Sequence, residues 1–511
     1  MKKVFLTGKM LLVGLFMTIV SNSCTDLTEQ TYDVLKTESF KTESEIISIV
    51  GAAYTNLYGF MNHGTIFSIQ EVSSDEMAIP HRGADWFDGG QWLRMHRHQY
   101  NTKEEAFNNA WQFCYRGISN CNRIIEQLGE ADPKLATRFV SELKVLRAMY
   151  YYYLLDLYGN VPIVTDFKKA DASPATKPRA EVFAFVEKEI KDNIGSLEKK
   201  ATYGRVNFYV GQAVLAKLYL NAQIYTNAAK WDDCIAACDA VITGSPYSLE
   251  SAYANNFIST NSTSKENIFA VPYDEKFAQG FNLVQMTLHY QSKATYNLTD
   301  QPWNGYCTMA EFYNSYDDAD VRKKANFVAG PQFSSAGVRL VDDQAEASDP
   351  DGKPLTFTPE LNQLEPNCLR QAGARVGKYA FKLGATPNLD NDAPLFRLAD
   401  IMLVKAEAIW RKAGAPATST DATALKLVND IRARAGVPAF ASLTKDNILA
   451  ELGREMFAEA WRRQDLIRYG IYTTAYGKFK TEVDKPCETV FPIPDAQIQA
   501  NKNLQQNECY K

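Results

Sequence analysis

Hydrophobic residues recur at steps of three and four along most of the first half of the chain, the spacing that places them on one face of an α-helix. Between Glu142 and Tyr158 this face comprises Leu143, Leu146, Tyr150, Tyr153, Leu154 and Leu157. Similar patterns run over residues 43–60, 104–128, 181–195, 207–225 and 231–243. Because consecutive helices of this length can stack in pairs and bury a continuous core, as solenoid repeats do, we expect a mainly helical scaffold.

The pattern changes between about residue 245 and residue 394, where Gly, Pro, Asn, Ser and aromatic residues follow no sustained period. Helical spacing then returns over residues 395–413, 421–436 and 445–469. A structureless stretch of this length would be abnormal in a compact domain, so we interpret the middle as irregular structure resting on the helical scaffold. Such regions often hold the functional residues.

The first residues have the layout of a secretory leader. Three lysines open it, an apolar run extends from Met10 to Val20, and small residues lead to Cys24. The run is shorter than the roughly 20 residues that span a bilayer. This order predicts a lipoprotein signal over residues 1–23, with Cys24 as the acylated first residue of the mature chain; an ordinary signal with a nearby cysteine is the alternative.

Charge and cysteine content narrow the function classes. Removal of the leader, which has three lysines and no acid, takes the formal charge from −5 to −8, and this argues against nucleic acid as a partner. The eight cysteines after Cys24 have spacings typical of helices rather than of a disulfide framework; Cys114 and Cys121, for example, would lie about 10 Å apart on a helix, too far to bridge each other. No paired Cys or His motif completes four metal ligands, so neither a metal nor another cofactor is predicted.

Four segments are informative when they are taken together and in order: "SSDEMAIPHRGADWFDGG" (73–90), "LRAMYYYYLLDLYGNVPIVTD" (146–166), "LFRLADIMLVKAEAIWRKAG" (395–414) and "GREMFAEAWRRQDLIRYG" (453–470), the last followed by "FPIPDAQIQANKNLQQNECY" (491–510). Together they resemble the SusD/RagB family of surface lipoproteins. Small departures occur in the structural motifs: Ala460 stands where a Gly is usual, Lys502 replaces a common Pro, and Glu508-Cys509 replaces the usual Pro-Gly.

The resemblance implies a tetratricopeptide-like superhelix of helix pairs with a large irregular, loop-rich insertion. It implies one SusD-like domain over residues 24–511, with its scaffold at about 40–245 and 395–470 and its ligand-binding part at about 61–103 and 245–394. It further implies a non-catalytic lipoprotein, exposed on the outer membrane, that binds an oligosaccharide or polysaccharide and delivers it to a SusC-like TonB-dependent transporter. Family members also handle peptides, so peptides and other polar nutrients remain alternatives.

Two short segments offer a ligand surface. The stretch "DWFDGGQ" (85–91) sets two aromatic residues beside two glycines and two acids, which indicates a surface loop, and "TYNLTDQPWNGY" (295–306) has a similar composition. Sugars stack their apolar faces on aromatic rings, while Asp, Asn and Arg hydrogen-bond their hydroxyl groups. For each aromatic residue the alternative is core packing. The candidate ligand-binding residues are Trp86, Trp303, Arg82, Asp85, Tyr296, Asn304, Phe281 and Trp92.

Two rival functions fit parts of the pattern. A surface glycoside hydrolase could use Asp85 and Asp88, or Asp300, if two carboxyl groups lay about 5 to 9 Å apart across a cleft. A repeat scaffold that binds protein partners would use its helical face and leave the loop aromatics without a role.

Acidic residues in the C-terminal helices are predicted to be structural. Asp400 and Glu407 share one face of a helix with an apolar stripe, so each needs an ion-pair partner. Glu459 and Arg463 are expected to form an ion pair one helical turn apart. The candidate partners for Asp400 and Glu407 are Arg147, Arg432, Arg462 and Arg468.

Overall fold

The helices predicted from hydrophobic spacing are present, with bounds close to those expected. This computed structural model describes residues 40, 42–342 and 354–511, so the predicted leader and Cys24 lie outside the described residues. None of the helices in these ranges is both long enough and apolar enough to cross a membrane. The main helices are α2 (Glu43–Tyr54), α5 (Glu105–Leu128), α6 (Pro133–Leu157), α7 (Arg179–Asn193), α8 (Phe208–Leu220), α10 (Trp231–Ile242), α15 (Leu398–Lys412), α16 (Ala422–Arg434), α17 (Lys445–Met456) and α18 (Arg462–Arg468).

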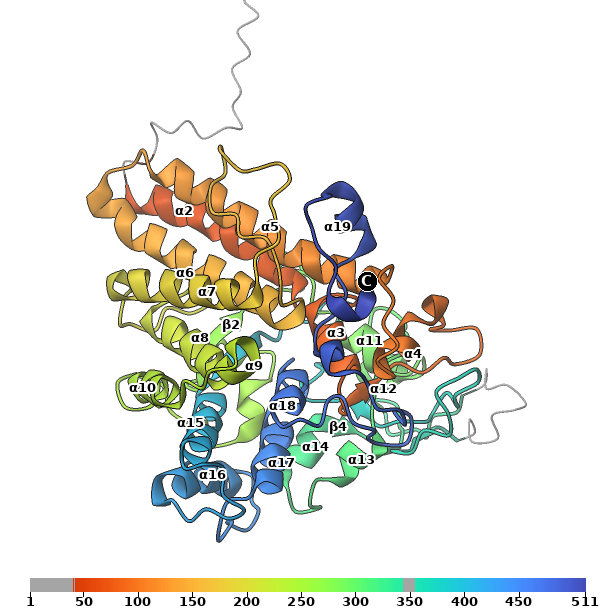
Figure 1. Ribbon diagram of the computed structural model, residues 1–511. Coiled ribbons are helices and arrows are strands. Elements are labelled where there is room, and N and C mark those ends of the chain that lie inside the picture. Colours follow the sequence, from red (N-terminus) through yellow and green to blue (C-terminus); the bar gives the residue numbers. More distant parts are fainter. Residues whose placement is uncertain (1–39, 41, 343–353) are drawn as a thin grey trace, which may run out of the picture. The chain divides into compact units, whose positions relative to one another are not determined.

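Neighbouring helices stack into one scaffold. Helix α5 packs on α6, α6 on α7, α8 on α10, α10 on α15, and α15 on α16. Figure 1 shows α6, α7, α8, α10, α15 and α16 one below another. The predicted mainly helical, tetratricopeptide-like stacking is therefore confirmed. The contact between α10 and α15 joins the helices that precede the irregular middle to those that follow it.

Helix starts are set by side chains that accept hydrogen bonds from free backbone N–H groups. Asp132 caps α6 ahead of Pro133, and Asn207 accepts from two backbone N–H groups of α8. Thr444 and Asn447 cap α17 reciprocally. Each cap of this kind contributes on the order of 1 kcal/mol and fixes where its helix begins.

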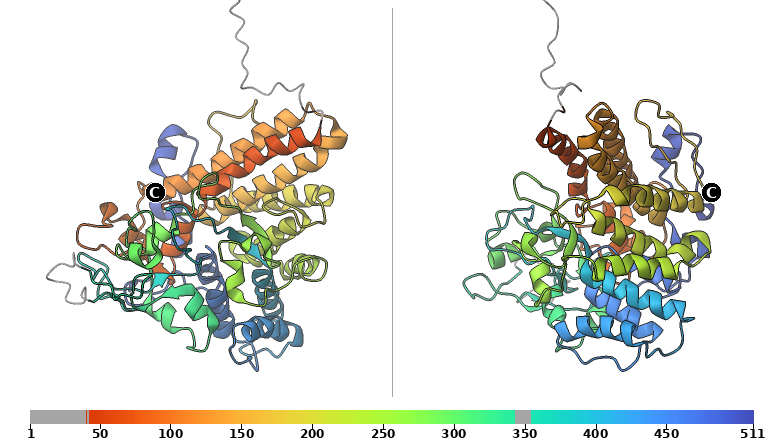
Figure 2. Two further views of the ribbon diagram at one scale, coloured as in Figure 1. Left: turned by 180° about the vertical axis from the view of Figure 1, so that it is seen from behind. Right: turned by 90° about the vertical axis from the view of Figure 1, so that its left-hand side faces the viewer.

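The irregular middle consists of short helices and two-stranded sheets. Strand β2 (Asn267–Val271) pairs antiparallel with β8 (Ala393–Arg397), which brings the two ends of the middle together. Residues 395–397, predicted as helix, are thus strand. Figure 2 shows the long helices gathered on one side and most of the middle on the other. The remaining elements are α3 (Ile66–Val72), α4 (Gln91–His96), α9 (Ala222–Thr226), α11 (Leu283–Thr287), α12 (Ser292–Tyr296), α13 (Ala310–Asn314), α14 (Val321–Asn326) and α19 (Asp495–Ala500), with β1 (Met77–Ala78) on β3 (Cys307–Thr308), β4 (Phe327–Val328) on β7 (Arg375–Val376), and β5 (Gly330–Pro331) on β6 (Thr356–Phe357).

Two predicted helices are interrupted. The one expected over 207–225 divides at Asn221 into α8 and α9, and the one expected over 445–469 breaks between α17 and α18. In the second break Ala458 and Ala460 have φ of 58° and 63°, the left-handed region that glycine adopts most easily. This conformation explains why a glycine is usual at position 460.

Buried glutamates from a distant segment stabilise the break between α17 and α18. Glu76 accepts a hydrogen bond from the N–H of Ala458 (3.2 Å), and Glu71 accepts one from the N–H of Ala460 (2.6 Å). Both carboxyl groups are fully buried, and each acts on the pKa of the other. Local sequence could not reveal these contacts, since the partners lie almost 400 residues apart.

The ion pair predicted between Glu459 and Arg463 is wrong because of this break. Glu459 and Arg463 do not form an ion pair one turn apart, because the chain between them is not helical. Glu459 instead pairs with Lys378 (2.5 Å) and Arg397 (2.6 Å), and Arg463 pairs with Asp156 (2.9 Å).

The structural role predicted for Asp400 and Glu407 is confirmed. Asp400 pairs with Lys217 at 3.0 Å, a partner the sequence did not suggest, and Glu407 pairs with Arg468 at 2.6 Å. Burial alone would raise the pKa of Glu407, but Arg468 and Arg411 outweigh it and hold the pKa at about 2. Both acids therefore tie α15 to neighbouring helices.

The buried pair Glu71 and Glu76 should make stability depend on pH. Burial raises the pKa of Glu71 to about 7 and that of Glu76 well above its usual value. A raised pKa means that stability is fully present below the unfolded value near 4.5 and is lost as pH rises through about 7. We expect the free energy of unfolding to be about 2 kcal/mol lower at pH 8 than at pH 5 through Glu71 alone. Denaturant titrations at both pH values measure the difference.

Replacing both residues by glutamine should remove most of this difference, because an amide keeps the acceptor oxygen for the backbone N–H groups but does not ionise. The same loss of stability in wild-type protein and in the Glu71→Gln, Glu76→Gln variant would show that other groups cause it.

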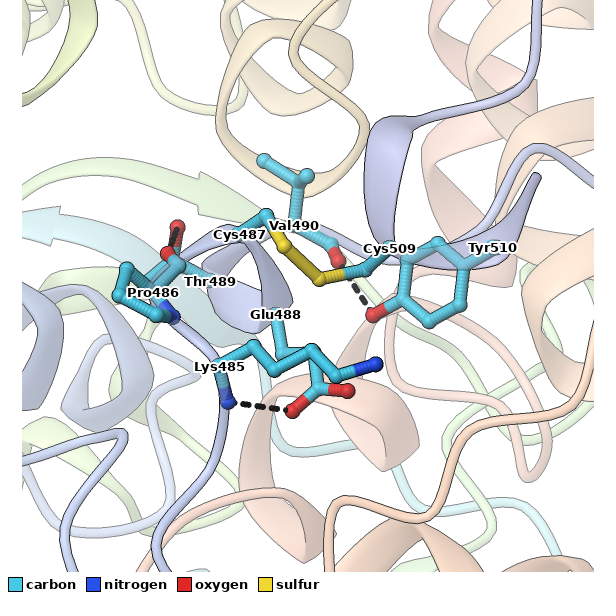
Figure 3. Close-up of a disulfide and its surroundings, with 8 residues drawn as sticks. All are labelled: Lys485, Pro486, Cys487, Glu488, Thr489, Val490, Cys509 and Tyr510. Carbon is cyan, nitrogen blue, oxygen red and sulfur yellow. Dashed lines mark hydrogen bonds between the residues drawn. A yellow bond between two sulfur atoms is a disulfide. The ribbon is translucent and has the colours of Figure 1, made fainter.

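The cysteine prediction is wrong for two residues. Cys487 and Cys509 form a disulfide, with Cα atoms 5.7 Å apart, that joins two short turns near the C-terminus (Figure 3). Beside it the Tyr510 hydroxyl donates to the carbonyl of Val490 at 2.9 Å. These cysteines lie outside the helical patterns, and only tertiary structure brings them together. The other cysteines in the described ranges, Cys114 and Cys121 among them, are buried thiols.

Candidate functional site

Residues from four segments line an open depression of about 470 Å³, which we call the tryptophan hollow. Its walls combine rings with polar groups, the mixture that sugar ligands require. The two aromatic segments predicted from sequence meet here, although more than 200 residues separate them. The lining residues are His63, Asp85, Trp86, Asp88, Tyr290, Gln301, Pro302 and Trp303.

The two tryptophans form adjacent walls. Their ring centroids lie 6.4 Å apart with the planes inclined at 50°, and the Trp86 indole N–H donates to the carbonyl oxygen of Trp303 at 2.6 Å. Gly305 permits this contact, because a Cβ at that position would lie 2.4 Å from the Trp86 ring. Trp303 is 39% exposed and Trp86 is half-buried. Of the two rings, Trp303 is therefore more accessible to a ligand, and Trp86 lies next to it.

The loop that presents Trp86 is conformationally strained. Trp86 and Asp88 have φ of 64° and 44°, and a left-handed conformation costs a residue with a side chain roughly 1 to 2 kcal/mol. Several hydrogen bonds hold the loop, among them that of the Trp86 indole and one from the Trp92 indole N–H to the Asp88 carboxylate at 2.8 Å. Strain of this kind gathers at functional sites, where the surrounding structure stabilises it.

His63 lines the hollow and contacts both tryptophan rings, and it was not predicted as a site residue from the sequence. Its ring is perpendicular to Trp86 at 5.3 Å, and its Nδ1 is 2.9 Å from the Tyr306 hydroxyl. Burial lowers the pKa of His63 to about 4, against the opposing effect of Asp88, so the imidazole is neutral at pH 7. A single histidine in a loop has no pattern that marks it as part of a site.

Tyr290 also lines the hollow and was not predicted from the sequence. Its hydroxyl donates to the Asp85 carboxylate, and the Arg370 guanidinium lies 4.4 Å above its ring. Arg370 is in turn paired with Asp342 at 2.7 Å. This part of the hollow is therefore preformed, which lowers the entropy lost when a ligand binds.

Four of the eight candidate residues lie below the surface. Arg82 is 3% exposed and donates to backbone carbonyl groups, including that of Ala372 at 2.8 Å, so it braces the base of the loop. Asn304 is fully buried between the Arg370 carbonyl and the Arg375 guanidinium. A ligand in the hollow cannot reach these groups, so they support the walls from behind.

Phe281 and Trp92 are core residues. Phe281 is fully buried, with its ring 4.8 Å from that of Tyr379, and Trp92 is 1% exposed. Tyr296 is half-buried against Phe381 at 5.5 Å and does not line the hollow. The structure thus keeps Trp86, Trp303 and Asp85 as ligand-facing candidates and places the other five elsewhere, because local composition does not distinguish a loop surface from the core beneath it.

A second depression, of about 270 Å³, lies on the helical side beside α2 and α6. Its arginines are already paired, Arg138 with Glu43 and Glu198, and Arg205 with Glu142. It presents no exposed pair of rings, so we place the candidate site at the tryptophan hollow. Across the described ranges, no group of three or more His, Cys, Asp or Glu side chains could hold a metal ion.

Comparison with known proteins gives a consistent assignment. The model of the SusD family matches residues 378–510, and a model described as starch-binding and associating with the outer membrane matches residues 28–220. The starch-binding protein SusD of Bacteroides thetaiotaomicron is 25% identical over 441 residues, which is 77% of each chain.

Solved structures agree in fold. A laminarin-binding SusD-like protein superposes with a TM-score of 0.73 at 21% identity, over 92% of this chain and 100% of that one. Surface glycan-binding protein A of Bacteroides thetaiotaomicron, in complex with laminarihexaose, has a TM-score of 0.73 at 22% identity, over 91% and 99% of the two chains. The two family matches at opposite ends of the sequence, the curated relative and the shared helical fold all agree with the resemblance of the four segments and support the assignment of this chain to the SusD family.

Proposed function

We propose that this protein binds a glycan in the tryptophan hollow. The observation that carries the proposal is the pair Trp86 and Trp303, set at an angle on preformed loops beside carboxylate groups. Inclined rings can stack on successive sugar units of a bent oligosaccharide, while Asp85 and Asp88 accept hydrogen bonds from its hydroxyl groups. The names of relatives that bind starch or laminarin support a glycan ligand.

We further propose that the protein is a non-catalytic lipoprotein of the outer membrane that delivers its glycan to a SusC-like TonB-dependent transporter. The leader before Cys24 supports the anchor, and the family model associated with the outer membrane supports the location. The carboxylates of the hollow have structural partners, Asp85 with Tyr290 and Asp88 with Trp92, in keeping with a binding role.

Calorimetric titration of the protein beginning after Cys24 tests the ligand class. Maltohexaose and laminarihexaose are the first probes, and a panel of glycans and peptides follows. We expect saturable binding of at least one glycan and no new reducing ends after incubation. Release of reducing ends would favour a glycoside hydrolase, and binding of peptides alone would replace the glycan.

Cys24→Ala should yield a folded protein that no longer partitions with the outer membrane, because the acyl chains that would anchor the mature chain cannot be attached. Membrane fractionation after expression in a host that processes lipoproteins measures this, with thermal unfolding of the released protein as the control for folding. A variant that fractionates with the membrane like the wild type would contradict the anchor at Cys24.

A further inference from the structure

The ligand-facing charge of the tryptophan hollow is negative. Asp85 and Asp88 line it and are both exposed. One oxygen of Asp85 accepts from the Tyr290 hydroxyl, and one oxygen of Asp88 accepts from the Trp92 indole N–H. The second oxygen of each carboxylate has no hydrogen-bond partner among the described residues, and so it is available to a ligand.

The cationic groups near the hollow are turned away or already paired. Arg82 is buried against backbone carbonyl groups, Arg94 pairs with Glu104 at 2.6 Å, and Arg370, which lies over the Tyr290 ring and does not line the hollow, pairs with Asp342. The Lys293 ammonium donates to the carbonyl of Thr299 at 3.0 Å. The neutral ring of His63 adds no positive charge. Among the described residues, an anionic ligand would therefore meet two carboxylates and no cation that lines the hollow.

We propose that the tryptophan hollow accepts glycans without negative charge and rejects glycans that carry uronate or sulfate groups, with Asp85 and Asp88 as the residues that discriminate. This inference rests on the proposed glycan-binding function. Uncharged hydroxyl groups donate to the free carboxylate oxygens, whereas an anion placed within a few ångströms of them is repelled and must shed water without gaining a partner.

Matched ligand pairs test the discrimination. Laminarihexaose and maltohexaose are each compared with the same hexaose oxidised at C6 to the uronic acid, by calorimetry at low and high salt. We expect each neutral hexaose that binds to bind at least about tenfold more tightly than its carboxylated form at low salt, and the ratio to fall as salt screens the repulsion. Equal or tighter binding of the carboxylated form would overturn the inference.

The variant Asp85→Asn, Asp88→Asn tests the assignment of the two residues. Asparagine retains an oxygen that accepts from Tyr290 and from Trp92, and it tolerates the left-handed conformation of position 88. We expect the ratio between neutral and carboxylated ligands to shrink severalfold, while the melting temperature stays near that of the wild type. Asp446→Asn, an exposed acid on α17 away from the hollow, is the matched control and should leave the ratio unchanged.

The outcomes separate the two proposals. If some glycan binds but both members of its pair bind alike, only the charge selection is overturned. If the double variant keeps the wild-type ratio, discrimination by Asp85 and Asp88 is overturned. If no glycan of either kind binds, the proposed function fails and this inference fails with it.

Discussion

Arg397→Met is expected to lower the free energy of unfolding by about 4 kcal/mol, more than any other single change considered. Arg397 is fully buried and donates to three buried glutamates: Glu266 at 2.6 Å, Glu455 at 3.0 Å and Glu459 at 2.6 Å. Methionine fills a similar volume but removes the positive charge that compensates these carboxylates. A buried charge without a compensating partner destabilises the folded state. Equilibrium denaturation in urea, monitored by circular dichroism, measures the loss.

The size of this effect follows from what Arg397 connects. It stands at the end of β8, directly before α15, while Glu266 precedes β2 and the other two acids belong to the region of α17 and the break after it. One guanidinium therefore joins both ends of the irregular middle to the C-terminal helices. Arg434 and Lys378 remain to pair with some of the acids, which keeps the expected loss within a few kcal/mol.

An exposed ion pair provides the matched control. Lys426 pairs with Asp430 at 2.6 Å on the surface of α16, where the side chains are 73% and 42% exposed. Because solvent screens such a pair, Lys426→Met should change stability by less than about 0.5 kcal/mol. If Arg397→Met were as mild as this control, the buried ion pairs would not hold the middle to the scaffold.

Long helices could be predicted from sequence because their pattern is local. The stripe through α6 predicts both its existence and its buried face, and the stacking of such helices follows from it. The break between α17 and α18 could not be predicted, since Glu71 and Glu76 stabilise it from the other end of the chain. The disulfide between Cys487 and Cys509 depends on tertiary structure in the same way.

The candidate site shows the same difference between features with a local sequence pattern and features that depend on tertiary contacts. The loop positions of Trp86 and Trp303 could be predicted, because Gly, Pro and Asp around a tryptophan indicate a loop. Phe281 and Trp92 have similar neighbours but point into the core, and whether an aromatic ring faces out or in depends on what packs above it. His63 and Tyr290 have no local signal, because they join the site only through contacts with distant loops.

The two tryptophans should be separable by experiment, because the structure gives them different roles. Trp303→Ala removes an exposed ring, so it should weaken glycan binding by roughly 1 to 3 kcal/mol with little change in melting temperature. Trp86→Ala removes a half-buried ring that contacts His63 and donates to Trp303, so it should weaken binding at least as much and also lower stability. Calorimetry and thermal unfolding of each variant measure the two effects.

Two further variants make the comparison sharp. Trp86→Phe keeps an aromatic ring but loses the indole N–H, so it should retain part of the binding while Trp303 is held less firmly. Phe277→Ala removes a ring that is 91% exposed but does not line the hollow, so affinity should stay at the wild-type value.

If Trp303→Ala bound glycan normally, or if Phe277→Ala weakened binding as much as Trp303→Ala, the ligand would lie elsewhere. Normal affinity in Trp86→Ala combined with a collapsed melting temperature would instead assign that ring to the fold, because a stacking platform loses affinity when its ring is removed, whereas a core residue loses stability.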